Sequence, residues 1–286
     1  MVLRGGGDPT VPIDVAADCE FVGAADDRVD GVVTVTIDRP DARNALNATV
    51  RSELKTVLQA IGDGDGDGDR DGGHRVVVIT GADAAKAFVA GADVTEFPDR
   101  DVFEQRAVSE GDRVYDLVAD LDIPTIARIN GHALGGGCEL ALACDVRIAH
   151  ERAKLGQPEI NLGIIPGGGA TQRLPRLVGT GQALRLILSG ELIDAEEASE
   201  IGLVEECHPD GTFDERVYEL AGSMAEKSKH ALVLAKRAVR ASDRMPIDAG
   251  IDHERELFLH QFNTPDKDEG IRAFLEDRDP EWTDRA

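Results

Sequence analysis

Two carboxylates stand among small and apolar residues in this chain of 286 residues. Glu139 follows a run of three glycines and precedes Leu-Ala-Leu-Ala, and Glu159 follows Gln157-Pro158 in a similarly apolar context. This setting predicts burial, which raises the pKa of a carboxyl group toward neutrality and suits it for proton transfer. A single carboxylate in such a setting more often has a structural role. The features around the pair must therefore decide between a structural role and proton transfer.

Both carboxylates lie in glycine-rich segments that join strand-like runs to helix-like runs. Three such junctions occur, at residues 86–97, 130–140 and 155–174. Glycine lets the backbone approach a ligand closely, and a helix that starts there directs free N–H groups at whatever lies opposite. Two facing junctions could therefore hold an anion or a developing oxyanion. The alternative, which one junction alone would favour, is that the glycines only let a helix pack tightly on a sheet.

Several familiar signatures are missing from the sequence. It contains no GxxxxGK[ST] or GxGxxG nucleotide motif and no GxSxG nucleophile elbow. The four cysteines form neither a CxxC pair nor a zinc-type cluster with histidine. Cys138 and Cys144 are expected to be buried thiols. The sequence therefore predicts no metal site and no redox cofactor.

The chain is strongly acidic, with a net charge of −24 and 24 arginines against only 7 lysines. This charge opposes binding to nucleic acid or to an anionic membrane surface, because both need a basic face. Abundant Asp and Glu with scarce Lys favours a high-salt cytoplasm, where salt screens the self-repulsion; the alternative is an acidic fold in ordinary salt. No apolar run reaches the roughly 18 residues of a membrane span, and the N-terminus lacks the apolar core of a signal peptide. We therefore expect a cytoplasmic protein.

The hydrophobic pattern alternates between short extended runs and helical stretches. β-Branched, mostly apolar runs predict strands over residues 31–38, 75–80, 124–130 and 145–149. Helical spacing predicts helices over 48–61, capped by Asn47, and over 101–121. This order predicts an α/β fold with right-handed βαβ units. After about residue 167 the pattern becomes almost wholly helical.

We divide the chain into three regions. Residues 1–16 are expected to form a flexible extension, residues 17–212 the α/β core, and residues 213–286 a helical C-terminal region. Within the core, the Gly/Asp-rich tract 62–73 has no side chains to bury and should form a solvated loop.

In their order along the chain, these motifs resemble the crotonase superfamily, also called the enoyl-CoA hydratase/isomerase family. The segments that carry the resemblance are RPDARNALN (39–47), AFVAGAD (87–93), NGHALGGGCE (130–139), GQPE (156–159), IPGGGATQRL (165–174) and EGIRAFLE (269–276). The resemblance covers about residues 17–282. It implies a spiral of ββα turns with a helical C-terminal trimerisation region, and assembly into a homotrimer or homohexamer.

The resemblance also implies roles for individual residues. The backbone N–H groups of Ala92 and Gly136 would form an oxyanion hole for a thioester carbonyl, and Glu139 and Glu159 would be the catalytic carboxylates. Substrate-binding positions would be Asn44, Ala45, Leu46, Ala90, Gly91, Asp93, His132, Gly135 and Gly167. His132 stands where an aromatic residue is frequent, which could affect the preferred acyl chain. Ala170 replaces a frequent glycine.

The implied reaction is hydration of the C2=C3 bond of a 2-enoyl-CoA, with no cofactor beyond the CoA of the substrate. Glu139 would activate water and Glu159 would supply the proton to C2; the alternative is that the two carboxylates act together. The alternatives are an enoyl-CoA isomerase, which needs one carboxylate, another acyl-CoA reaction of the superfamily, or a non-catalytic acyl-CoA-binding protein.

The anionic CoA must approach an acidic protein. Helix N-termini would offset this repulsion, and Arg39, Arg43 or a neighbouring subunit's arginine equivalent to Arg278 could contribute. Surface ion pairing is the alternative role for these arginines.

Overall fold

The computed structural model describes residues 16–25, 28–63, 73–98, 100–111 and 114–283. The expected N-terminal extension, except for Ala16, lies outside these residues, as do residues 64–72 of the expected Gly/Asp loop. The first residues of that tract, Gly62 and Asp63, are helical instead, because the first long helix continues through them.

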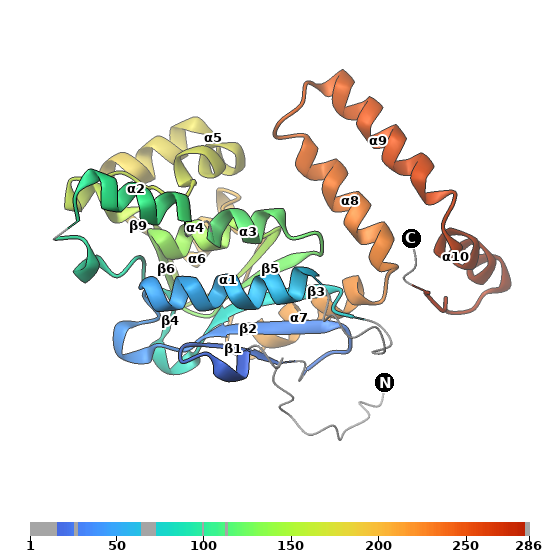
Figure 1. Cartoon of the computed structure of the whole chain (residues 1–286), viewed down its shortest axis with the longest axis horizontal. Helices are drawn as coiled ribbons and strands as arrows, with labels where there is room; N and C mark the ends of the chain where they lie inside the picture. The colour runs from blue at the N-terminus through green and yellow to red at the C-terminus, as the bar shows by residue number, and fades with distance from the viewer. Residues whose placement is uncertain (1–15, 26–27, 64–72, 99, 112–113, 284–286) are drawn as a thin grey trace.

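A six-stranded sheet forms the centre of the molecule (Figure 1). Its strands, in spatial order, are β1 (Val22–Ala25), β2 (Val32–Ile37), β3 (Val76–Gly81), β5 (Thr125–Ile129), β7 (Val146–His150) and β10 (Glu206–His208). Strand β1 is antiparallel to β2, and the other pairs are parallel. The four strands expected from the β-branched runs are all present, within two residues of their expected ends. Their parallel pairing confirms the expected α/β architecture.

Both faces of this sheet are covered, which explains why its central strands are apolar throughout. All six residues of β3 are buried. Val77 and Ile79 pack into one core with helix α1 (Ala48–Asp63). Val76 and Val78 point the other way and pack with helix α7 (Phe213–Ala225). The alternation of side chains along the strand thus produces two apolar layers.

A second sheet has four short strands in the order β4 (Ala87–Val89), β6 (His132–Leu134), β8 (Lys154–Gly156) and β9 (Leu192–Asp194). Strands β4, β6 and β8 are parallel, and β9 is antiparallel to β8. Strands β6 and β8 directly follow a strand of the larger sheet, and β4 follows β3 after a short 3-10 helix, Asp83–Ala85. Helical segments come next after each of the three. Each turn of the chain therefore contributes one strand to each sheet and then a helical segment.

The remaining helices are α2 (Val102–Gly111), α3 (Val114–Asp120), α4 (Gly136–Ala143), α5 (Ala170–Ser189), α6 (Ala195–Glu200), α8 (Lys229–Ala241), α9 (Ile247–Gln261) and α10 (Pro265–Glu276). The expected cap of α1 is present, since Asn47 Oδ1 accepts a hydrogen bond of 2.8 Å from Val50 N–H. The expected helix over 101–121 is divided into α2 and α3. The expectation of an almost wholly helical chain after residue 167 missed β9 and β10, because strands of three residues are too short to show an alternating pattern.

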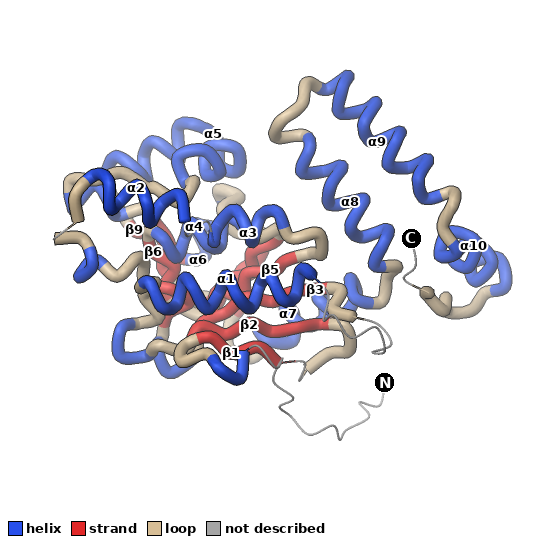
Figure 2. The backbone as a smooth tube through the Cα atoms, in the orientation of Figure 1, coloured by secondary structure: helices blue, strands red, loops and turns tan. Residues whose placement is uncertain are grey.

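Helices α8, α9 and α10 extend away from the two-sheet core (Figures 1 and 2). Helices α8 and α9 run side by side in opposite directions. Cys138 and Cys144 are buried free thiols, as expected. Within the described ranges, no helix combines the length and apolarity that crossing a bilayer requires.

Candidate active site

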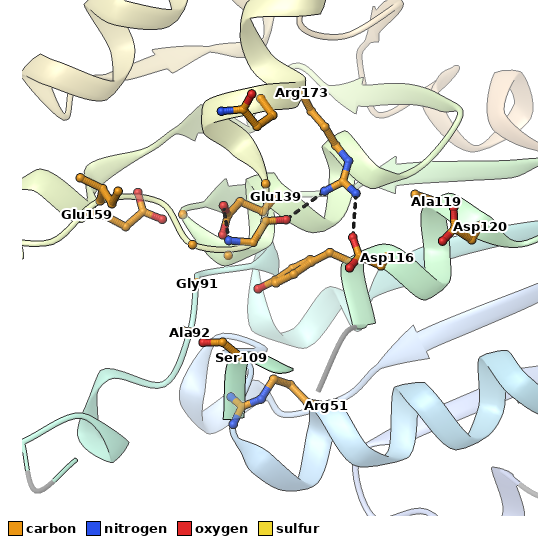
Figure 3. Close-up of a pocket in the computed structure, with 18 of the residues that line it drawn as sticks. Arg51, Gly91, Ala92, Ser109, Asp116, Ala119, Asp120, Glu139, Glu159 and Arg173 are labelled. Atoms are coloured by element: carbon orange, nitrogen blue, oxygen red, sulfur yellow. Dashed lines mark hydrogen bonds and ion pairs between the residues drawn. The ribbon is translucent and has the colours of Figure 1, made fainter. Parts of the chain in front are cut away.

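The three glycine-rich junctions meet at one pocket of about 1520 Å³, drawn in Figure 3. Strand β4 leads into the first junction, β6 into the second and β8 into the third. Because these strands are neighbours in one sheet and run parallel, their C-terminal ends open at the same edge. Eight of the residues singled out in the sequence line the pocket: Ala90, Gly91, Ala92, Gly135, Gly136, Glu139, Glu159 and Gly167.

The N–H group of Ala92 is directed away from the segment that pairs with it. Ala92 forms a parallel bridge with Leu46. Leu46 N–H donates to Gly91 C=O at 2.9 Å, and Leu46 C=O accepts from Asp93 N–H at 3.0 Å. In a parallel bridge of this kind, one residue uses both of its backbone groups, and here that residue is Leu46. The residue opposite it, Ala92, uses neither. Ala92 N–H therefore remains available on the pocket side.

Gly136 contributes a second free N–H group. It is the first residue of α4, so its N–H has no acceptor within the helix. A methyl group placed on Gly136 would lie 3.2 Å from Ala92 N. Two unpaired N–H groups from different junctions therefore lie around one point of the pocket, and the N-terminal end of α4 adds its positive dipole there.

Glu139 projects into the pocket from the first turn of α4 and is 3% exposed. Its Oε1 accepts hydrogen bonds from Gly168 N–H at 2.7 Å and Ala170 N–H at 3.1 Å. Burial raises the pKa of Glu139, while these donors and the charge of Arg173 oppose the rise. One carboxylate oxygen is therefore held firmly, and the donors favour the ionised form.

Glu159 lies on a short 3-10 helix, Pro158–Leu162, and its environment differs from that of Glu139. Its Oε2 is buried without a hydrogen-bond partner among the described residues. Burial, together with the negative charge of Glu139, raises the pKa of Glu159 to about 7. The two carboxylates are thus distinguished by their surroundings, and Glu159 is the one that holds a proton near neutrality.

Gly135 is the residue that lets Glu159 approach the second junction. Its φ of +50° lies in the left-handed region that favours glycine. A Cβ atom at this position would lie 2.7 Å from Glu159 Oε1, inside van der Waals contact. A side chain here would displace the carboxyl group.

Arg173 and Asp116 brace the loop that holds Glu139. The guanidinium of Arg173 donates to Gly168 C=O at 2.9 Å and pairs with Asp116 at 3.3 Å. In the view of Figure 3, Glu139 lies between Glu159 on one side and the Arg173–Asp116 pair on the other. The same loop residue, Gly168, thus accepts from Arg173 and donates to Glu139.

A sequence model described as enoyl-CoA hydratase/isomerase matches residues 27–285. The chain belongs to the enoyl-CoA hydratase/isomerase family. This confirms the resemblance to the crotonase superfamily.

Relatives of known name agree with this assignment. The 2,3-dehydroadipyl-CoA hydratase of Escherichia coli is 43% identical over 257 residues, which are 89% of this chain and 96% of that protein. The crotonyl-CoA hydratase of Syntrophomonas wolfei is 42% identical over 85% of this chain and 90% of that protein. The solved structure of an enoyl-CoA hydratase from Bacillus anthracis matches with a TM-score of 0.86 at 38% identity, covering 93% of this chain and 100% of that one. The expected crotonase-type fold is therefore confirmed.

The remaining positions singled out from the family resemblance lie outside the lining of the pocket: Asn44, Ala45, Leu46, Asp93 and His132. Segment 43–46 does lie beside the first junction, because Ala90 N–H donates to Arg43 C=O at 3.1 Å. The side chain of Asn44 is buried and donates to Ala87 C=O at 2.9 Å, and that of Leu46 is part of the core. A substrate at this edge would therefore meet their backbone.

Asp93 and His132 also have partners within the protein. Asp93 pairs with Arg39 at 2.7 Å and accepts from Thr95 N–H. His132 Nδ1 accepts from Lys154 N–H at 3.2 Å. Burial, with the nearby charges of Arg43 and Lys154, lowers the pKa of His132, so its ring is neutral at pH 7. Contact of either residue with substrate stays a prediction.

Tyr115, Asp116 and Arg173 also line the pocket, although the sequence did not predict them as site residues. Tyr115 and Asp116 lie in a helix of ordinary composition, far from every glycine-rich junction. Arg173 lies in the segment 165–174, but nothing in the sequence distinguishes it from other arginines. No local pattern indicates these residues, because their place in the site depends on how α3 and α5 pack. Within the described part of the chain, no group of three or more His, Cys, Asp or Glu side chains is arranged to hold a metal ion.

Proposed function

We propose that this protein is an enoyl-CoA hydratase that adds water across the C2=C3 bond of a 2-enoyl-CoA to give a 3-hydroxyacyl-CoA. The observation that carries the proposal is the pair of carboxylates with unlike surroundings beside two convergent N–H groups. Hydration needs both a base and an acid, and it places negative charge on the thioester oxygen. The site offers a group for each of these requirements.

Ala92 and Gly136 would bind the thioester oxygen through their N–H groups. When water adds to C3, the electrons of the C2=C3 bond move toward the carbonyl and the oxygen gains negative charge. Donors that are already in place stabilise this charge without reorganisation, and one such donor is worth about 10²–10³ in rate. The N-terminal dipole of α4 acts in the same direction.

The protons move between water, the substrate and the two carboxylates. Glu139 takes a proton from the attacking water as the oxygen bonds to C3. Glu159 gives its proton to C2 of the resulting enolate. Glu139 is then protonated and Glu159 is ionised, and exchange with solvent restores the starting state. Because these groups account for every proton, we propose that the reaction needs no metal and no cofactor beyond the CoA of the substrate.

Hydration is favoured over isomerisation because two carboxylates are present in different environments. An isomerase moves one proton and needs a single carboxylate. The names of the relatives, a crotonyl-CoA hydratase and a 2,3-dehydroadipyl-CoA hydratase, point the same way. The deciding assay follows loss of the enoyl-thioester absorbance of crotonyl-CoA in molar KCl. Absence of turnover, together with conversion of a 3-enoyl-CoA to its 2-enoyl isomer, would establish the isomerase instead.

The pH dependence of the reaction should report the proton on Glu159. Its pKa of about 7 means that the acid form is lost as the pH rises through 7. We therefore expect kcat/KM for crotonyl-CoA to decline above about pH 7, approaching tenfold per pH unit. Measurement at constant ionic strength from pH 6 to 9 checks this. A profile that is flat to pH 9 would contradict the assignment of Glu159 as the acid.

For CoA, we propose binding along segment 43–46, where Arg43 is exposed. Arg39 is engaged with Asp93 at 2.7 Å, and Arg278 with Glu269 at 2.6 Å, so both already have carboxylate partners. Of these three arginines, we therefore propose that Arg43 binds a phosphate group of CoA. We also retain a high-salt cytoplasm as the proposed location, on the strength of the net charge of −24.

We further propose that residues 213–286 assemble the protein into a trimer or hexamer around the core at 17–212. The C-terminal helices and the turn before α9 expose an unusual number of large apolar side chains: Val239, Met245, Ile247, Ile251, Phe258, Leu259, Phe262, Ile271, Phe274 and Leu275. Exposed apolar surface on this scale marks an interface. Light scattering in molar KCl should give three or six times the chain mass of 30.6 kDa. A mass equal to one chain would contradict this proposal.

A further inference from the structure

The hydroxyl group of Tyr115 lies beside the two convergent N–H groups. Tyr115 is the second residue of α3 and lines the pocket. A methyl group placed on Gly136 would lie 2.7 Å from Tyr115 Oη and 3.2 Å from Ala92 N. The hydroxyl and the two N–H groups therefore surround the same small region of the pocket.

The ring of Tyr115 is held in place from the third junction. A Cβ atom on Gly168 would collide with ring atoms Cδ2 and Cε2 and would lie 2.6 Å from Glu139 Oε2. The ring edge thus packs against Gly168, the residue whose N–H holds the other oxygen of Glu139. Glycine at 168 leaves room for both the ring and the carboxylate.

No described residue forms a hydrogen bond with Tyr115 Oη, although the residue is partly buried. Burial and the negative charges of Glu139 and Glu159 raise the pKa of Tyr115, so the phenol stays protonated across the working pH range. A half-buried phenol usually has a partner in the finished complex. The missing partner should be an acceptor located in the pocket.

We propose that Tyr115 donates a third hydrogen bond to the thioester oxygen of the bound substrate. The inference rests on the proposed function, since it assigns the oxygen to the point between Ala92 and Gly136. A neutral phenol donates more strongly as its acceptor becomes negative, so the bond strengthens as the enolate forms. Tyr115 would then be a catalytic residue that complements the two backbone donors.

Replacement of Tyr115 by phenylalanine removes the donor and keeps the ring against Gly168. We expect kcat for crotonyl-CoA to fall about 10- to 100-fold, with a smaller change in KM. The chain offers a matched control, because it has one other tyrosine. Tyr218 Oη bonds Thr34 Oγ1 at 3.1 Å on the far side of the large sheet, so Tyr218→Phe should leave the rate unchanged.

A direct readout is the infrared stretch of a ¹³C-labelled carbonyl in butyryl-CoA bound to the protein. Butyryl-CoA has no double bond to hydrate, so this measurement does not depend on turnover. The wild type and Tyr218→Phe should lower the stretching frequency equally, and Tyr115→Phe should restore part of the shift. If the frequency in Tyr115→Phe equals that of the wild type, the proposal is overturned, whatever happens to the rate.

The same experiment separates failure of this inference from failure of the proposed function. A wild type that polarises the butyryl carbonyl but does not hydrate crotonyl-CoA would contradict hydration alone. A wild type that leaves the carbonyl unpolarised would overturn the role of Tyr115 as well.

If Tyr115→Phe does not fold, fluorotyrosine can be incorporated in place of tyrosine throughout the Tyr218→Phe protein. Position 115 is then the single fluorinated residue. Fluorination makes the phenol a stronger donor, so the carbonyl frequency should fall further than with ordinary tyrosine. An unchanged frequency would again overturn the proposal.

Discussion

Glu159→Gln is expected to lower kcat for hydration of crotonyl-CoA by about 10²–10⁴-fold, the usual contribution of a positioned acid or base. Glutamine keeps the size and polarity of the side chain but has no proton to give to C2. Because Oε2 of Glu159 lacks a partner, the substitution breaks no hydrogen bond at that atom. The loss should therefore appear in kcat, measured from the enoyl-thioester absorbance at saturating substrate.

Glu139→Gln provides the companion measurement. It should also abolish most hydration, because glutamine cannot accept the proton of water. Near-full activity in both variants would refute the assignment of the two carboxylates. The exposed Glu200 serves as a control, since Glu200→Gln changes the net charge equally and lies outside the pocket lining.

Glu159→Gln should also reveal how much the ionised carboxylate destabilises the fold. The pKa of Glu159 is raised in the folded state, so the folded protein holds this proton more tightly than the unfolded chain does. Wild-type stability is then lost as the pH rises from the ordinary glutamate pKa through about 7. Glutamine at position 159 cannot ionise, so the variant does not lose this stability. The melting temperature of the variant minus that of the wild type should therefore increase from pH 5 to pH 8.

Gly136→Ala is expected to reduce kcat/KM by about 10²-fold or more, close to the loss of a full oxyanion donor. The added methyl group would lie 3.2 Å from Ala92 N and 2.7 Å from Tyr115 Oη, which places it where the thioester oxygen must bind. The N–H of residue 136 remains, yet the oxygen can no longer reach both donors. Steady-state kinetics with crotonyl-CoA measures the effect.

The backbone at Gly136 should accept alanine without unfolding, because this glycine is helical and has no positive φ. Gly181 provides the matched control: it also lies in a helix, α5, and a methyl group there meets nothing within 4 Å. Gly181→Ala should leave hydration unchanged. An active Gly136→Ala enzyme with ordinary thermal stability would show that the oxyanion lies elsewhere.

Local sequence determined the elements that build the core. β-Branched runs specify strands wherever the sheet is covered on both faces, and this is why four strands were recognised within two residues of their ends. The same reasoning missed β9 and β10, whose three-residue lengths are set by pairing with neighbours. Asn47 was recognised as a cap because a cap bonds only to residues next to it in the chain.

The candidate site was predicted in part for a similar reason. Glu139 and Glu159 were recognised because a carboxylate among glycine and apolar residues is conspicuous in the sequence itself. The order of their acidities was not visible there. It depends on hydrogen bonds made in the folded protein. Oε1 of Glu139 accepts N–H groups from the 168–170 loop, whereas Oε2 of Glu159 has no partner among the described residues. Those donors lie about thirty residues from Glu139 along the chain.

The sequence by itself thus determined the strands, the glycine junctions, the two carboxylates and, through its motifs, the family. Only the tertiary structure decided that Ala92, Gly136 and Tyr115 surround one point, and that Arg173 and Asp116 brace the loop that holds Glu139. The physical reason is that strand formation, capping and the need for glycine depend on neighbours in the chain. Convergence, burial and pKa depend on packing between segments that the sequence keeps apart.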